Sequence, residues 1–275
     1  MMIRLRRAEH VMGTVVSFDI DSAFGAAVDD AARWLHWVDA TFSTFRADSE
    51  VSRLGRGEIT PSQCSPQVRE VLAGCAALSA RTGGYFSATA SGSLDPSGYV
   101  KGWAVERAAA LLTAAGSPSH CVNGGGDVRC VGPSPRGGDW RIGIADPLRR
   151  GELAVIVEGQ DFAVATSGIA ERGRHVLDPL SGRPPEGLLS VTVTGPDLAL
   201  ADAYATAVFA MGYPRALDWR AERHAAFGIT ANGGIWRTPG FPAAGAPLWL
   251  ARVRGLAWRR PPRAPVGRHR VIRIA

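Results

Sequence analysis

The sequence predicts an α+β fold in a single domain over residues 3–240. Apolar residues recur at helical spacing in the first third of the chain and again after residue 197. The middle instead holds short runs of strand-forming residues separated by glycine, proline or aspartate. Because the two kinds of segment do not alternate regularly, the pattern favours a meander or mixed sheet over a βαβ series.

A strand and a helix open the domain. Alternating apolar residues from Met12 to Ile20 predict a strand over His10–Asp21. Ser22 is a suitable helix cap, and apolar residues then repeat at helical spacing as far as Phe45. Two more helices are expected, each closed by glycine, over residues 65–82 and 99–115.

Strand-like segments fill the middle of the chain, and helices return after them. The expected strands are 120–132 (with a glycine-rich turn), 140–145, 153–158, 162–166, 175–177 and 189–194. A helix over Asp197–Met211, a short helix near 214–223 and a hairpin turning at Asn232-Gly233 complete the domain. Residues 241–275 are rich in Pro, Arg and Ala, and we expect a basic tail that is extended or poorly ordered.

Composition excludes several classes of protein. The 275 residues are 46% hydrophobic with a net charge of +6, and much of the excess lies at the two ends. No basic stripe with interleaved aromatic residues runs through the middle, so no nucleic-acid partner is expected; a DNA-binding tail would show a steep salt dependence. The four cysteines form no CxxC pair, which disfavours a zinc site and predicts reduced, structural thiols.

The ends of the chain bear on localisation. The opening residues are basic but lack the apolar run and cleavage site of a signal peptide. No stretch has the 18 or so apolar residues that span a bilayer. We therefore expect a cytoplasmic protein that meets a membrane only through a partner.

Asp202 and Thr206 are the first candidate site. They lie four residues apart on an expected helix, so a carboxylate and a hydroxyl share one face. Hard oxygen ligands of this kind suit Mg²⁺. The alternative is a surface aspartate with a threonine bonded back to its own helix.

Lys101 belongs to a second candidate site, where a turn containing Gly98 leads into a helix. Backbone N–H groups at a helix start attract anions, and a lysine adds positive charge, so a pyrophosphate would fit. The spacing is not that of a P-loop. An ordinary capped helix start remains the alternative.

Two further segments have polar residues beside glycine. Asn123-Gly-Gly-Gly-Asp127 would let backbone approach a ligand closely, or would be a plain turn. His175 is a candidate general base or phosphate ligand, or else a structural histidine. The sequence has no G-x-S-x-G elbow, so a hydrolase triad lacks support.

Seven motifs, taken in order, resemble those of the FAD:protein FMN transferase family, also called ApbE-like. The resemblance runs from about residue 9 to 240. Its motifs are Met12-Gly-Thr14, Phe42–Glu50, Asp95-x-x-Gly98-x-x-Lys101-Gly102, Asn123–Asp127, Thr166-Ser-Gly168, His175-x-x-Asp178-Pro-x-x-Gly182 and Ala201-Asp-Ala-x-Ala-Thr206.

The resemblance implies an ApbE-like (T-fold-like) single domain with mixed or antiparallel sheets and packed helices. It implies FAD as substrate and Mg²⁺ close to the pyrophosphate. The implied metal ligands are the side chains of Asp202 and Thr206, with the backbone carbonyls of Gly98 and Ala205. His175, Lys101 and Asp202 are the implied catalytic residues. The implied FAD-binding residues are Met12, Phe45, Tyr85, Phe86, Ser87, Asp95, Asn123, Asp127, Ser167, Leu177 and Asp178.

The chain departs from the family pattern in four places. Phe45 stands where a Tyr is common, and Tyr85-Phe86-Ser87 where a small residue, Phe and Asp are common. Glu106 replaces a common Asp. The stretch from that aromatic run to Asp95, a region where the resemblance implies contacts to FAD, is also shorter than is usual in the family.

The implied reaction is Mg²⁺-dependent transfer of the FMN half of FAD to a Ser or Thr hydroxyl of an acceptor flavoprotein, with release of AMP. A membrane redox protein is one candidate acceptor. Two alternatives stay open: an FAD pyrophosphatase that uses water, and a non-catalytic FAD-binding protein.

Overall fold

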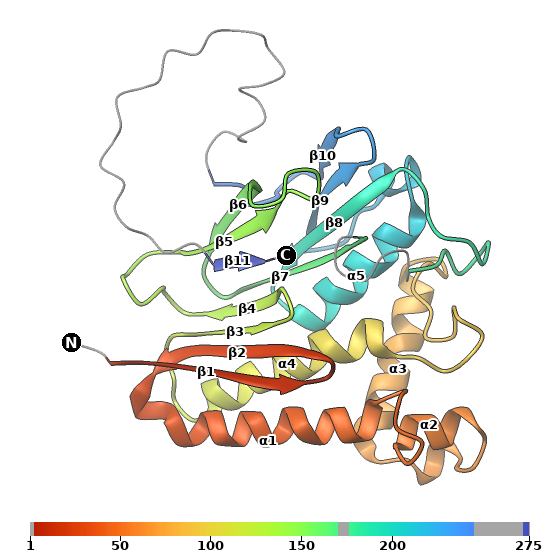
Figure 1. Ribbon diagram of the computed structural model, residues 1–275, viewed down its shortest axis with the longest axis horizontal. Coiled ribbons are helices and arrows are strands. Elements are labelled where there is room, and N and C mark those ends of the chain that lie inside the picture. The colour runs from red at the N-terminus through yellow and green to blue at the C-terminus, as the bar shows by residue number, and fades with distance from the viewer. Residues whose placement is uncertain (1–2, 170–175, 245–271, 275) are drawn as a thin grey trace, which may run out of the picture.

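The computed structural model describes residues 3–169, 176–244 and 272–274, and it has three layers: helices, a large sheet and a small sheet (Figure 1). The α-helices are α1 (Gly25–Phe42), α2 (Glu50–Gly55), α3 (Pro66–Arg81), α4 (Ser97–Ala114) and α5 (Leu198–Met211). Short 3₁₀ helices lie at Ser22–Phe24, Pro61–Gln63 and Arg215–Asp218.

The large sheet has eight antiparallel strands in the order β1-β2-β3-β4-β7-β8-β9-β10. They are β1 (Arg4–Val11), β2 (Thr14–Asp21), β3 (His120–Gly124), β4 (Asp127–Val131), β7 (Phe162–Gly168), β8 (Leu188–Gly195), β9 (Ala225–Thr230) and β10 (Ile235–Arg237). The small sheet, β11-β5-β6, contains β5 (Trp140–Ala145), β6 (Leu153–Gly159) and β11 (Ile272–Ile274). β11 runs parallel to β5, so the mixed and antiparallel sheets of the expected α+β class are both present.

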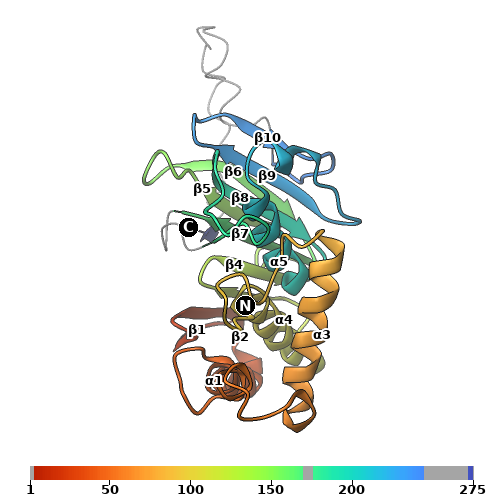
Figure 2. The ribbon, with the colours of Figure 1, turned by 90° about the vertical axis from the view of Figure 1, so that its right-hand side faces the viewer.

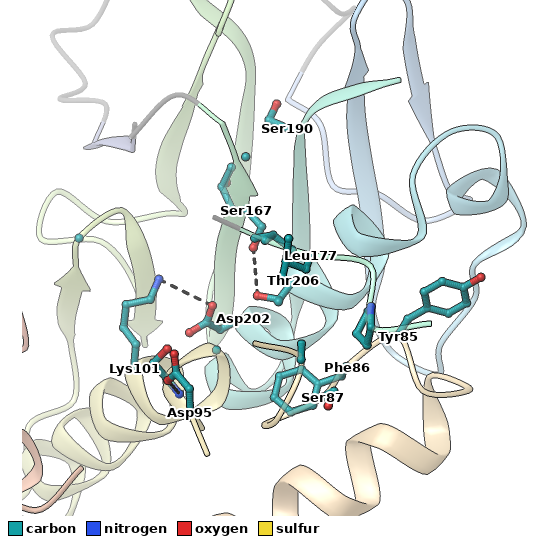
Figure 3. A pocket seen from close by; sticks show the side chains of 18 of the residues that line it. Tyr85, Phe86, Ser87, Asp95, Lys101, Ser167, Leu177, Ser190, Asp202 and Thr206 are labelled. Carbon is teal, nitrogen blue, oxygen red and sulfur yellow. Dashed lines mark hydrogen bonds and ion pairs between the residues drawn. The ribbon is translucent and has the colours of Figure 1, made fainter. Parts of the chain in front are cut away.

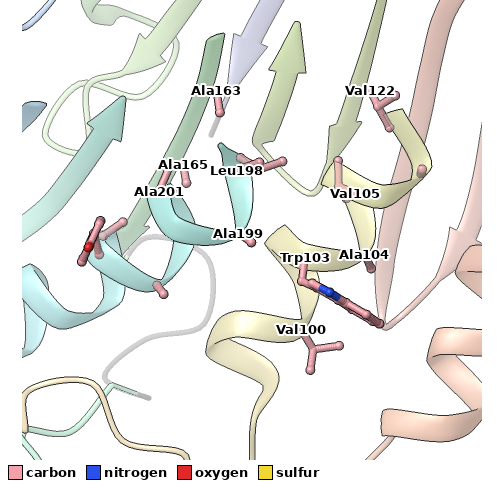
Figure 4. Close-up of a cluster of buried hydrophobic side chains, with 14 of the residues drawn as sticks. Val100, Trp103, Ala104, Val105, Val122, Ala163, Ala165, Leu198, Ala199 and Ala201 are labelled. Atoms are coloured by element: carbon pink, nitrogen blue, oxygen red, sulfur yellow. The ribbon is translucent and has the colours of Figure 1, made fainter. Parts of the chain in front are cut away.

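Strand alternation builds a core on each face of the large sheet. In β7, Ala163 and Ala165 belong to the core under the helices, whereas Val164 between them packs with the small sheet. Cys121 and Val122 of β3 divide in the same way. The alanines leave room for α5, which lies against β7 and β8 (Figures 2 and 4).

α4 and α5 pack against each other more closely than any side chain larger than hydrogen would allow at Gly102. A Cβ built there would lie 2.6 Å from the Leu198 carbonyl oxygen and 2.7 Å from Asp202 Cβ. Glu106, one turn further along α4, accepts a hydrogen bond from the Leu198 amide at 2.8 Å and pairs with Arg129 at 2.9 Å. Asp197 caps the same helix start by accepting from Leu200 N. The beginning of α5 is therefore fixed from α4 and β4.

The start of the chain differs from the sequence prediction. The expected strand at His10–Asp21 is a hairpin, because β1 precedes β2 and the chain turns at Met12 and Gly13, with φ of 55° and 67°. Charged residues on both faces of β1 hid this strand, because they leave no apolar alternation at its start. Arg4 pairs with Asp19 of β2 at 2.8 Å.

Helix boundaries also shift. α1 ends at Phe42 rather than at Phe45, and α2 was not expected. α4 begins at Ser97, two residues earlier than predicted, and the expected helix at 214–223 is limited to the 3₁₀ turn at Arg215–Asp218. Val176 and Leu177 are not in a strand, and His175, which was expected to begin one there, lies outside the described residues.

Part of the segment after Gly240 joins the small sheet. Glu158 N donates to the Pro242 carbonyl at 3.3 Å, and Ala244 N donates to the Ile156 carbonyl at 2.8 Å. Phe241 is buried and stacks on Phe227 at 5.5 Å between ring centroids. Residues 241–244 thus continue the hydrogen bonding of β6.

Candidate functional site

A cleft opens where the N-terminal end of α4 and the middle of α5 meet the C-terminal end of β7 and the beginning of β8 (Figure 3). Its volume is about 240 Å³. The lining includes ten of the residues expected at the site: Tyr85, Phe86, Ser87, Asp95, Gly98, Lys101, Ser167, Leu177, Asp202 and Thr206. Residues from five separate parts of the sequence therefore converge on one cavity.

Asp202 is buried at the bottom of the cleft, with 3% of its surface exposed. Its Oδ2 accepts a hydrogen bond from Gly102 N at 2.9 Å, and its Oδ1 lies 3.7 Å from Lys101 Nζ. Burial, reinforced by the Asp127 carboxylate and opposed by Lys101, raises the pKa of Asp202 to about 7. The interpretation as a surface aspartate is therefore wrong.

Thr206 lies one turn beyond Asp202 on α5, and its Oγ1 is 3.2 Å from Ser167 Oγ of β7 (Figure 3). Gly98 lies beside it, since a Cβ built there would be 3.8 Å from Thr206 Oγ1. The carboxylate of Asp202 and two hydroxyl groups thus face the cleft from neighbouring elements. Ala205 is fully buried within α5.

This set of oxygens fits Mg²⁺ if a ligand supplies the rest. Within residues 3–169, 176–244 and 272–274, no three His, Cys, Asp or Glu side chains gather to hold a metal. Mg²⁺ is commonly held by one or two carboxylates together with phosphate oxygens and water. A single buried carboxylate with adjacent hydroxyl groups, opening onto a cleft, has the donors for that arrangement.

Lys101 adds positive charge to the wall of the cleft. It forms an ion pair with Asp127, whose side chain is only 1% exposed. Asp127 also accepts from Thr166 N at 3.1 Å, which ties the β3–β4 hairpin to β7. The expected close approach of backbone also occurs, because Gly125 of that hairpin lines the cleft with φ of +60°.

The start of α4 is shaped by Asp95, which accepts a hydrogen bond from Ser97 N at 3.0 Å. The preceding aromatic run is fixed by Thr82 at the end of α3, because Thr82 Oγ1 accepts from Phe86 N at 2.9 Å. Phe86 is buried beside Gly98, and Tyr85 and Ser87 also line the cleft (Figure 3).

Besides Ala205, five other expected residues that the structure describes do not line the cleft. Phe45 is 99% exposed after the end of α1, and Met12 forms the β1–β2 turn. Asn123 accepts from Gly126 N within its own hairpin, and Asp178 accepts from Leu180 N and Ser181 Oγ within its own turn. Asp127 does not line the cleft itself but contacts Lys101, which does. His175 lies outside the described residues.

The cleft also has lining residues that the motifs did not single out. Ser190 of β8 pairs in register with Gly168 of β7, where a Cβ would be 2.6 Å from the Leu189 carbonyl oxygen. Ser190 alternates along β8 with Thr192 and Thr194, so nothing in the local sequence distinguished it. Ala145 and Pro147, which follow β5, line the cleft from the small sheet, and nothing in the local sequence marked them.

Comparison with known proteins gives a consistent result. A family model described as the ApbE family matches residues 12–93 and 89–228. An FAD:protein FMN transferase of Rhodobacter capsulatus is 36% identical over 157 residues, which is 53% of this chain and 30% of the relative. One from Vibrio cholerae is 34% identical over 134 residues, which is 45% of this chain and 40% of the relative. The match therefore spans less than half the length of either relative.

The fold has a close counterpart among solved structures. The crystal structure of the ApbE protein of Thermotoga maritima superimposes with a TM-score of 0.79 at 22% identity, covering 87% of this chain and 98% of that one. In the part of the chain that our structure describes, no helix is both long enough and apolar enough to cross a bilayer.

Proposed function

The chain belongs to the ApbE family, and from that premise we propose that it transfers the FMN half of FAD to a hydroxyl group of an acceptor protein. The observation that carries the proposal is the cleft in which Asp202, Thr206 and Lys101 converge. Relatives named as FAD:protein FMN transferases share up to 36% of their residues with it over the matched region. The acceptor residue is a Ser or Thr, and the other product is AMP.

Mg²⁺ supplies charge neutralisation at the pyrophosphate when it is bound. In the proposal, Asp202 and Thr206 hold this ion, with the Gly98 and Ala205 carbonyl groups as further ligands. Ser167 is placed to orient Thr206, since their hydroxyl oxygens are 3.2 Å apart. Mg²⁺ is the resident cofactor in this scheme, whereas FAD is consumed.

Residues of the protein would stabilise the phosphate charge and accept the proton. Lys101 and the amide groups at the start of α4 offset charge on the phosphates. We assign to His175 the acceptance of the proton from the attacking hydroxyl, a step worth roughly 10²–10⁴-fold in other enzymes. The hydroxyl oxygen bonds to the FMN phosphorus, and the bond from that phosphorus to the bridging oxygen breaks, so AMP departs with that oxygen.

The direct test mixes the protein, FAD and Mg²⁺ with candidate acceptors and seeks an FMN adduct on Ser or Thr by mass spectrometry. Asp202→Asn should lower labelling by about 100-fold or more, because it removes charge at the site of the ion. Asp218→Asn, at an exposed carboxylate in the last 3₁₀ turn, is the matched control and should label normally.

Other outcomes separate the competing functions. Free FMN and AMP formed without any acceptor would identify a pyrophosphatase. FAD that binds but stays intact with Mg²⁺ and every acceptor would identify a binding protein. Unchanged labelling by Asp202→Asn would show that the cation site is assigned wrongly.

A further inference from the structure

Asp127 is buried beside the cleft without lining it, and it is in direct contact with the cleft residue Lys101. Its side chain is 1% exposed, and both of its oxygens are engaged. Oδ2 pairs with Lys101 Nζ, and Oδ1 accepts from Thr166 N at 3.1 Å. A buried carboxylate with two fixed contacts has a defined position, so it can fix the position of its lysine partner.

Lys101 lies between two carboxylates and is closer to one of them. Its ammonium is in direct contact with Asp127 but is 3.7 Å from Asp202 Oδ1. The other oxygen of Asp202 already accepts the Gly102 amide at 2.9 Å. Oδ1 is therefore the oxygen through which Asp202 would bind a cation, and it is also the oxygen that the lysine faces (Figure 3).

A lysine in direct contact with Asp202 would neutralise it and occupy the space next to Oδ1. Lys101 is next to Gly102, the residue of α4 that meets Asp202 of α5, and its ammonium is 3.7 Å from Asp202 Oδ1. Only a small side-chain movement therefore separates the present arrangement from that pair. Asp127 offers the competing contact from the start of β4. Its own place is set by the Gly125–Gly126 turn and by the Thr166 amide.

We propose that Asp127 is a positioning residue that holds Lys101 off Asp202, so that the Asp202 carboxylate stays available to a divalent cation. This inference rests on the proposed function, because it takes Asp202 as the ligand of the cation. It differs from the FAD contact that the sequence resemblance implied for Asp127, since Asp127 acts through Lys101 rather than on the nucleotide.

The test is a double-mutant cycle read out by Mg²⁺ affinity rather than by activity. Mg²⁺ is titrated by calorimetry into FAD-saturated protein without an acceptor, for wild type, Asp127→Asn, Lys101→Met and the double variant. Asn keeps an oxygen for the Thr166 amide, and Met keeps the length of the lysine stem, so the fold should survive. Thermal unfolding of all four proteins checks this.

Asp127→Asn should weaken Mg²⁺ binding by about 10-fold or more, because the released lysine pairs with Asp202. Lys101→Met should then restore Mg²⁺ affinity in the Asp127→Asn background. The increase in affinity that Lys101→Met causes there should be about 10-fold larger than the increase it causes in the protein that keeps Asp127. An Asp127 that contributed only charge or only structural support would give the same effect of Lys101→Met in both backgrounds. That result would overturn the inference.

The failures can be told apart. If wild type and Asp202→Asn bind Mg²⁺ equally, the cation site of the proposed function is wrong, and the inference falls with it. If wild type binds Mg²⁺ through Asp202 but the cycle is additive, the proposed function stands and the role of Asp127 alone is rejected.

Discussion

Thr206 illustrates how a single hydroxyl is given a role by its surroundings. On a free helix it would bond back to its own backbone, but here its Oγ1 is 3.2 Å from Ser167 Oγ and faces the cleft. Asp202, one turn away, is buried rather than hydrated. The two side chains therefore form a pair because β7 and α4 enclose them.

Thr206→Val should test that pair. Valine keeps the branched shape but removes the oxygen, so we expect Mg²⁺ affinity and FMN transfer to fall by about 10-fold or more while the unfolding temperature changes little. Thr206→Ser keeps the hydroxyl and should retain most of both. Calorimetry with Mg²⁺ and adduct mass spectrometry measure the effects; equal behaviour of the Val and Ser variants would remove Thr206 from the cation site.

At the scale of elements, the site depends on how closely α4 and α5 approach. Gly102 lets the α4 backbone touch α5 and lets its own amide donate to Asp202. The side chains around this contact, including Trp103, Val105 and Leu198, belong to the same buried core (Figure 4). In the Lys101-Gly102 pair, the lysine thus supplies a positive charge to the cleft, and the glycine allows α4 and α5 to pack closely.

Gly102→Ala should separate the helices. Its new methyl group would meet Leu198 O at 2.6 Å and Asp202 Cβ at 2.7 Å, so we expect a loss of roughly 1–3 kcal/mol in the free energy of unfolding, with weaker Mg²⁺ binding. Gly25→Ala is the matched control within a helix, because its Cβ would come no closer than 3.9 Å to Leu5. Urea unfolding compares them, and a Gly102→Ala variant as stable as Gly25→Ala would contradict the packing argument.

Elements with a clear period were predictable, and those with mixed signals were not. The run of apolar residues in α5 and the Asn232-Gly233 turn could be identified from local sequence. β1 was missed because Arg4, Arg6 and Arg7 leave no clear apolar alternation at its start, although ion pairs such as that of Arg4 with Asp19 satisfy the charge. α2 is only six residues long, too short for a period to show.

For the whole molecule, the sequence motifs identified which residues meet but not the contacts that hold them. The distance between Asp95 and Asp202 along the chain is bridged by α4–α5 packing, and ordered motifs were enough to anticipate that convergence. The burial of Asp202 and the Asp127–Lys101 pair depend on long-range packing between β4, β7 and α4, which no local pattern encodes.

His120, at the start of β3, is fully buried where α4 joins the large sheet. Its Nε2 lies 3.1 Å from the Ala109 carbonyl oxygen, which identifies that nitrogen as the donor, and Nδ1 is 3.1 Å from Ser117 Oγ. Burial lowers the pKa of His120 from 6.5 to about 4. Between these values the unfolded chain binds a proton that the folded protein excludes, so stability is lost as the pH falls through 6.5, and this loss levels off below about 4.

The acid sensitivity of the fold should therefore decrease when His120 is replaced by a residue that does not titrate. From pH 7 to pH 4.5 the proton linkage of this one imidazole removes about 2 kcal/mol of unfolding free energy. His120→Gln keeps a donor for Ala109 but has no proton to gain, so its loss over this range should be smaller than that of wild type by about that amount. Urea unfolding at the two pH values measures the difference. His10→Gln, at an exposed histidine of β1, is the control and should lose as much unfolding free energy over this pH range as wild type does. If His120→Gln lost as much as wild type and the control, the buried imidazole would not be the source of the acid sensitivity.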